Sequence, residues 1–160
     1  MLRSLVGSEM CIRDRSNVAH INVQQLISEM PEVIAAQNEL AKLEKDYTTQ
    51  IDNAFKEFQT KAQSYSADAA NQTDVTNQAR QKELESMQTN LQEFRDSAAQ
   101  ELQKKQMDLM TPLLEKARNA ITKVGQEQGF DYVIDASPNG GIILADGKDL
   151  IEDVKRELGF

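Results

Sequence analysis

The sequence predicts a chain of the α+β class that is mostly α-helical, with a small β-rich head and a long antiparallel coiled-coil hairpin of two helices. Aromatic residues make up only 5% of its 160 residues and tryptophan is absent, which favours narrow apolar seams over one large core. Two long stretches in the middle repeat apolar residues at helical spacing, and short segments near both ends are β-branched.

The first 16 residues differ in character from the rest of the chain. Charged residues interrupt every apolar run there, so the segment lacks the unbroken core of a secretory signal peptide. The string LVGSEMCIRDR resembles translated sequencing-adapter sequence, so we expect residues 1–16 to be non-native and the natural start, with any export signal, to be missing. Cys11 lies in this segment and is the chain's one cysteine, which excludes a disulfide scaffold for the remainder.

Residues 17–31 are predicted to form the first part of the head. Apolar and polar residues alternate over residues 18–23, and their β-branched content predicts a short strand. Leucine, isoleucine and methionine then fall at helical spacing over residues 26–30. Pro31 is predicted to end this short helix and to lie in the first turn of the next one.

Residues 32–124 are predicted to form the helical hairpin, which we call the arm. Apolar residues step by three or four over residues 40–65, and the same rhythm returns over residues 84–124. Small, amide and β-branched residues cluster at 66–76 and predict a mobile tip. Neither helix buries its stripe alone, so each is expected to cover the other. Pro112 lies inside the second stripe and predicts a bend.

Residues 125–160 are predicted to complete the head with two strands and a helix. A strand at 142–144 is expected to pair with a strand at 132–134 in a hairpin across the turn sequence SPNGG. Asp149 suits the N-cap of an amphipathic helix at 150–158. So small a sheet is expected to need partner chains. The candidate oligomer residues of the head are Ile21, Val133, Ile134, Ile142, Ile143 and Leu144.

Residues that serve catalysis are sparse. His20 is most simply a half-buried strand histidine. Asp131 and Asp135 lie four residues apart and would suit a metal pair, but capping of nearby backbone is the favoured interpretation. The segment DGKDL lacks the earlier glycine and the following serine or threonine of a phosphate-binding loop. The sequence therefore predicts a protein that is not an enzyme, with no cofactor and no metal site.

Charge and hydropathy exclude two further classes of function. The formal net charge is −8, whereas binding to a nucleic-acid backbone needs a basic surface, so we expect no nucleic-acid partner. No apolar run approaches the roughly 20 residues that span a bilayer as a helix.

From residue 17 onward the chain resembles the Skp/OmpH family of periplasmic chaperones. The resemblance is carried by the segments HINVQQLISEMPEV, LQKKQMDLMTPLLEKARNAITKVGQEQGFDYVID and GGIILADGKDLIEDVKRELG. It implies a homotrimer whose heads associate and whose arms surround a cavity. It further implies a periplasmic holdase that binds unfolded outer-membrane proteins there without ATP and prevents their aggregation, with peripheral membrane or lipid contact as a further interaction.

The charge of the arm departs from the best-known family members, whose arms are strongly basic. Residues 32–124 contain 15 acidic and 12 basic residues, a net charge of −3. This difference weakens the case for electrostatic attraction to anionic lipid or to acidic clients, and it favours apolar contact inside the cavity. Two alternatives remain: a prefoldin-like cytosolic chaperone, and a coiled-coil structural or interaction protein of the cell envelope that binds a folded partner.

Apolar side chains of the arm are candidates for contact with unfolded segments, although ordinary seam packing explains several of them equally well. Phe55 stands apart because, next to Phe58, it widens the stripe beyond what a two-helix seam requires. Two methionines flank the stripe near Pro112, and methionine adapts to irregular partners. The candidate client-binding residues are Phe55, Phe58, Tyr65, Met87, Met107 and Met110.

Overall fold

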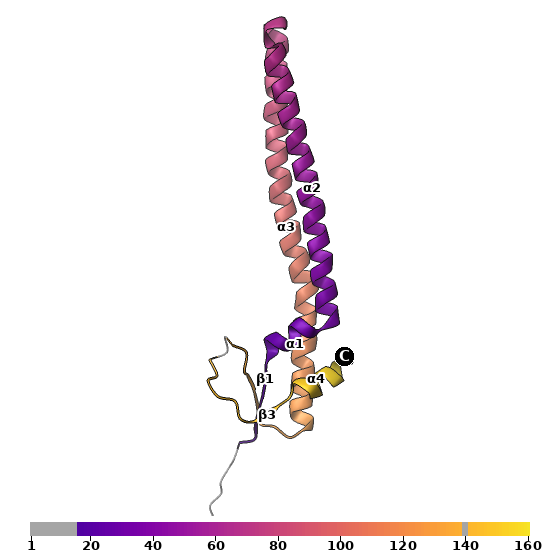
Figure 1. Ribbon diagram of the computed structural model, residues 1–160, viewed down its shortest axis with the longest axis vertical. Helices are drawn as coiled ribbons and strands as arrows, with labels where there is room; N and C mark the ends of the chain where they lie inside the picture. The colour runs from indigo at the N-terminus through magenta and orange to yellow at the C-terminus, as the bar shows by residue number, and fades with distance from the viewer. Residues whose placement is uncertain (1–15, 139–140) are drawn as a thin grey trace, which may run out of the picture. The chain divides into compact units, whose positions relative to one another are not determined.

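The computed structural model describes residues 16–138 and 141–160 (Figure 1). The elements are β1 (Val18–Ile21), α1 (Val23–Glu29), α2 (Pro31–Asp68), the 3-10 helix η1 (Ala69–Asn71), α3 (Asp74–Glu127), β2 (Tyr132–Asp135), β3 (Lys148–Asp149) and α4 (Ile151–Leu158). The predicted class, α+β and mostly helical, is confirmed. The expectation of a non-native segment falls on residues outside the described ranges, as does part of the SPNGG turn. Within the described ranges, no helix is long and apolar enough to span a bilayer.

The described residues divide into two compact units, one of residues 28–115 and one that joins residues 16–27 to residues 116–138 and 141–160. In the first unit, α2 and most of α3 run alongside each other in opposite directions (Figure 1). Tyr47 and Phe94 meet edge to face across the pair with ring centroids 6.0 Å apart. The predicted helical hairpin is therefore confirmed.

The seam of the hairpin is narrow. Leu91 and Ala98 of α3 are buried, whereas most other stripe residues of both helices are half-buried. This follows from geometry, because two helices shield only the side of each that faces the other. An ion pair between Lys105 Nζ and Glu39 Oε1, 2.9 Å apart, joins the helices at the edge of the seam. A single arm thus leaves apolar surface accessible along its length.

The second unit contains a three-stranded sheet in the order β2-β1-β3. Both outer strands run parallel to β1: Val18 pairs with Tyr132 at one edge, and Ala19 pairs with Lys148 at the other. Parallel neighbours need a long crossover connection, and α1, α2 and α3 together supply the one between β1 and β2. The arm is therefore an insertion between two adjacent parallel strands.

The predicted hairpin between residues 132–134 and residues 142–144 is wrong. Residues 142–144 lie in no strand, and the third strand is β3, a pair of polar residues further along the chain. Gly147 explains how β3 reaches β1, because a Cβ atom at this position would lie 3.0 Å from the backbone oxygen of Val18. The third strand thus lies where a glycine eases a close backbone approach, and not where β-branched residues gather.

Apolar side chains from several elements form the core of this unit. Leu26 of α1 is fully buried, as are Leu150 and Val154, which lie at and within α4. Gly125 in α3 provides room for β2, since a Cβ there would lie 2.8 Å from Val133 Cγ2. Asp149 Oδ1 accepts a hydrogen bond from the Ile151 N–H at 2.9 Å and supports the first turn of α4, but the N-cap residue is Leu150, one position after the predicted Asp149.

Candidate functional site

Acidic residues of the second unit, which contains the sheet, accept hydrogen bonds from nearby backbone. Asp131 Oδ2 accepts a hydrogen bond from the Asn17 N–H at 2.8 Å, and Asp135 Oδ1 accepts one from the Ser137 N–H at 2.9 Å, which confirms the expected backbone capping. Burial raises the pKa of Asp135, but the Ser137 and Val23 hydrogen bonds outweigh it and hold that pKa below its ordinary value. Among the residues described, no three His, Cys, Asp or Glu side chains gather as a metal site would require.

A shallow groove lies on the arm between α2 and α3. Phe55 is 39% exposed and Phe58 is half-buried, and both line this groove because residues three apart share a helix face. The guanidinium carbon of Arg95 lies 5.9 Å from the centroid of the Phe55 ring, a cation–π arrangement. The groove has a volume of about 440 Å³ and is completed by Gln88, Thr89, Leu91 and Gln92.

The three candidate methionines lie elsewhere on the arm. Met107 is 55% exposed, whereas Met87 and Met110 are half-buried. The structure also exposes Ile34 and Leu114, which the sequence analysis missed. A signal for both was present, because each directly follows another apolar residue and two consecutive helical positions cannot both face one narrow seam.

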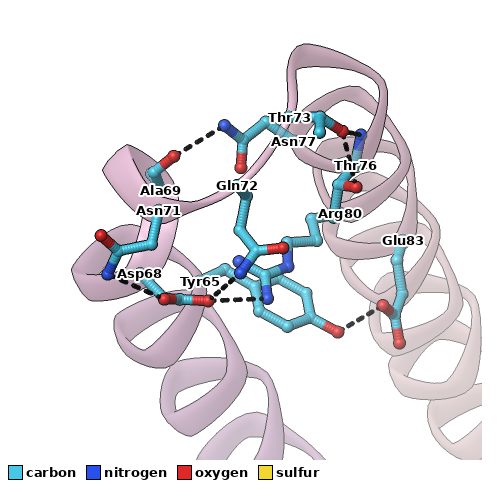
Figure 2. Close-up of polar contacts among 10 residues, drawn as sticks. All are labelled: Tyr65, Asp68, Ala69, Asn71, Gln72, Thr73, Thr76, Asn77, Arg80 and Glu83. Carbon is cyan, nitrogen blue, oxygen red and sulfur yellow. Dashed lines mark hydrogen bonds and ion pairs between the residues drawn. The ribbon is translucent and has the colours of Figure 1, made fainter.

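Figure 2 shows a network of polar contacts that closes the hairpin at its tip. Asp68 is its centre: Oδ2 accepts hydrogen bonds from Gln72 Nε2 at 2.7 Å and Arg80 Nη2 at 3.1 Å, and Oδ1 accepts one from Asn71 Nδ2 at 3.2 Å. The hydrogen bonds from Asn71 and Arg80 hold the pKa of Asp68 below its ordinary value, against the effect of burial. The carboxylate thus links the end of α2 to the start of α3.

Tyr65 belongs to this tip network and not to the groove. Its ring lies under the Arg80 guanidinium, 4.7 Å from centroid to carbon, and its hydroxyl donates to Glu83 Oε2 at 2.5 Å (Figure 2). Lys61 donates to the other oxygen of Glu83. The Lys61 and Tyr65 hydrogen bonds lower the pKa of Glu83, and the bond to Glu83 raises the pKa of Tyr65. The tip therefore joins α2 and α3 through two carboxylates.

The turn itself is shorter than the break predicted at residues 66–76. α2 continues to Asp68, and α3 begins at Asp74. Thr73 acts as the N-cap of α3, because its Oγ1 accepts a hydrogen bond from the Thr76 N–H at 3.2 Å. The amide and hydroxyl residues that predicted a break in the helix instead cap and cross-link the helix ends, and the mobility of the tip stays a prediction.

We expect acidification to loosen the tip. Because Asp68 and Glu83 have lowered pKa values in the folded chain, their contacts stabilise it above the ordinary carboxyl range, near pH 4 to 4.5, and this stability is lost as the pH falls further. Melting curves followed by circular dichroism at pH 7 and pH 3 should show a smaller acid-induced drop for Asp68→Asn than for the unchanged protein. Asp46→Asn, an exposed position on α2, is the control. Equal acid sensitivity of all three proteins would contradict the assignment.

The candidate residues of the head fall into two groups. Ile21 is buried in the unit, and Val133 is half-buried against Gly125. The other four are exposed in the single chain, and Ile143 and Leu144 are the most exposed, at 102% and 83%. A small hollow of about 190 Å³ lies beside β1. Three of these exposed candidates line it together with Val18 and His20, namely Ile134, Ile142 and Leu144.

Comparisons with known proteins agree with this architecture. Residues 17–158 match the model of a family described as outer membrane protein (OmpH-like). The chaperone protein Skp of Yersinia enterocolitica is 26% identical over 149 residues, which cover 89% of this chain and 86% of the relative. A solved OmpH-like outer membrane chaperone from Caulobacter crescentus shares the fold, with a TM-score of 0.80, 12% identity and coverage of 89% of this chain and 83% of that chain.

Proposed function

Because the chain belongs to the OmpH-like family of outer membrane proteins, we propose that it is an ATP-independent holdase that keeps unfolded outer-membrane proteins from aggregating. Its relative from Yersinia enterocolitica is a Skp chaperone, and the family is one of chaperones and not of enzymes. The clients are proteins on their way to the outer membrane, so the proposed location is the periplasm, which the chain would reach by export.

The observation that carries this proposal is the exposed apolar surface of the arm. Phe55, Met107, Ile34 and Leu114 each expose more than a third of their surface, as does Val75 at the start of α3. Scattered apolar contacts of this kind suit a partner without fixed shape, because many weak contacts together retain an unfolded chain. A folded partner would instead need one contiguous, complementary patch.

We assign self-association to the head, residues 17–31 and 125–160, and client contact to the arm, residues 32–124 with its tip near 66–76. The division into two compact units near residues 27 and 115 supports this assignment. Three heads associating through the exposed residues 142–144 would give a homotrimer, with three arms around one cavity. The arm has a net charge of −3, so apolar contact, and not electrostatic attraction, is the main source of client affinity.

The proposal is tested by an aggregation assay without nucleotide. An outer-membrane β-barrel protein unfolded in urea is diluted into buffer with and without the chaperone, and light scattering is followed. We expect suppression when chaperone trimers and clients are present in about equal numbers, with no change on addition of ATP. Scattering equal to that with an inert protein of the same mass concentration would refute holdase activity. Retention of the folded barrel but not of the unfolded one would favour the structural interaction protein.

A further inference from the structure

We propose that the groove around Phe55 and Arg95 binds an aromatic side chain of the unfolded client whose neighbours in the client sequence are acidic or neutral. This inference rests on the proposed holdase function and names the class of client segment that one site on the arm selects. It treats the groove as a subsite within a larger set of weak contacts.

The size of the groove fits one or two large side chains. Phe55 and Phe58 supply two aromatic rings, and the buried Leu91 is also part of the groove lining. A volume of about 440 Å³ accommodates one or two side chains but no folded element. Aromatic side chains gain the most from such a site because they bury the largest apolar area and pair favourably with other rings.

The charge of the groove differs from that of its surroundings. Its lining contains one cation, Arg95, and no carboxylate, although the arm carries a net charge of −3 and the whole chain −8. Amide groups of Gln88 and Gln92 are the other polar neighbours; one N–H of Gln92 donates to Asp96 Oδ1 at 3.0 Å, and the rest of that amide is available to a peptide backbone. The groove lining is therefore apolar with one cation, Arg95, and the Asp96 carboxylate lies beside it on the Gln92 amide.

Arg95 determines the expected preference between client sequences. A guanidinium stacks on an aromatic face and pairs with a carboxylate at the same time, and Arg95 already lies over the Phe55 ring. An acidic residue beside the bound aromatic ring can pair with Arg95, whereas a lysine there would be repelled by it. The field of the whole chain, at −8, predicts the opposite order, so the two effects can be separated.

The test uses short peptides rich in serine and glycine with one central tryptophan. The tryptophan is flanked by aspartates, by serines or by lysines, and it reports binding directly because the protein contains no tryptophan. Titrations use the full-length protein at about 0.15 M salt, where charges more than about 8 Å apart are largely screened. We expect the aspartate peptide to bind about threefold more tightly than the lysine peptide, the effect of one exposed charge pair.

Variants locate the preference. Arg95→Gln is expected to abolish or reverse the order of the aspartate and lysine peptides while the serine peptide binds nearly as before. Lys42→Gln, which removes an exposed cation elsewhere on α2, should leave the order unchanged. Phe55→Ser should weaken all three peptides roughly tenfold, through lost apolar contact. Circular dichroism checks that each variant keeps its helical content.

Three outcomes would overturn the inference. These are tighter binding of the lysine peptide to the unchanged protein, equal effects of Arg95→Gln and Lys42→Gln, and a change in oligomeric state caused by Phe55→Ser, which would make the groove an interface between copies of this chain. If suppression of aggregation succeeds while the peptide order fails, the holdase function stands without this subsite. If the peptide order holds but aggregation is not suppressed, the groove binds peptides and the holdase function is wrong.

Discussion

Replacement of Leu26 by alanine is expected to lower the free energy of unfolding by about 2–5 kcal/mol. Leu26 is 0% exposed in a unit whose described core contains few large apolar side chains, so a cavity at this position has little surrounding structure that could close it. Alanine favours the helical conformation of α1 at least as well as leucine does, so helix propensity does not contribute to the loss. Packing alone accounts for the expected change.

The measurement is urea unfolding followed by circular dichroism at one fixed protein concentration, because self-association would couple stability to concentration. Gln24→Ala on the same helix is the matched control, since the Gln24 side chain is exposed and its backbone N–H keeps its bond to Ser137 Oγ. The control should lie within about 0.5 kcal/mol of the unchanged protein. Equal midpoints for the two variants would show that Leu26 is not part of the core.

The arm could be predicted from sequence because its stabilising contacts repeat. Leu91 and Ala98 are buried at positions that the 3.6-residue period had marked, and their neighbours follow the same rule. The partners across the seam could not be predicted in the same way. That Tyr47 meets Phe94 depends on how far α2 continues before the turn, and the small and amide residues at the tip concealed this length.

The sheet was mispredicted because its third strand lacks the usual sequence signal. Residues 142–144 are apolar, and two of the three are β-branched, but they remain exposed in the single chain, whereas the polar pair Lys148–Asp149 forms β3. Gly147 eases the close backbone approach beside β1, but a glycine between two charged residues suggests only a turn. The exposure of this apolar segment, which stays outside the sheet of its own chain, is most simply explained by contact with a partner chain.

The groove could be predicted only in part. Phe55 was singled out because it widens the stripe, and its exposure in the structure agrees with that argument. Arg95 and the glutamines of the groove had no sequence signal, since the long helices are rich in such residues and only the pairing of α2 with α3 brings a particular one to Phe55. Local patterns thus indicated the apolar half of the site, and tertiary pairing supplied the polar half.

The substitution Ile143→Asp is expected to convert the proposed trimer into monomers at micromolar concentration. Ile143 is fully exposed in the single chain, so a carboxylate at this position should cost the folded monomer almost nothing. Buried without a partner in an interface, a carboxylate costs several kcal/mol, and 1.4 kcal/mol already weakens association tenfold. Three symmetry-related copies of the charge would repel one another as well.

Sedimentation velocity provides the measurement, since a monomer has a mass of 18.0 kDa and a trimer three times that value. Val75→Asp is the matched control: it places the same charge on another exposed apolar residue, in the first turn of α3, where a carboxylate is favourable. If the unchanged protein is already a folded monomer, the trimer is wrong. If Ile143→Asp stays trimeric, association does not use residues 142–144, and the outer edge of β2, with exposed Tyr132 and Ile134, becomes the next surface to test.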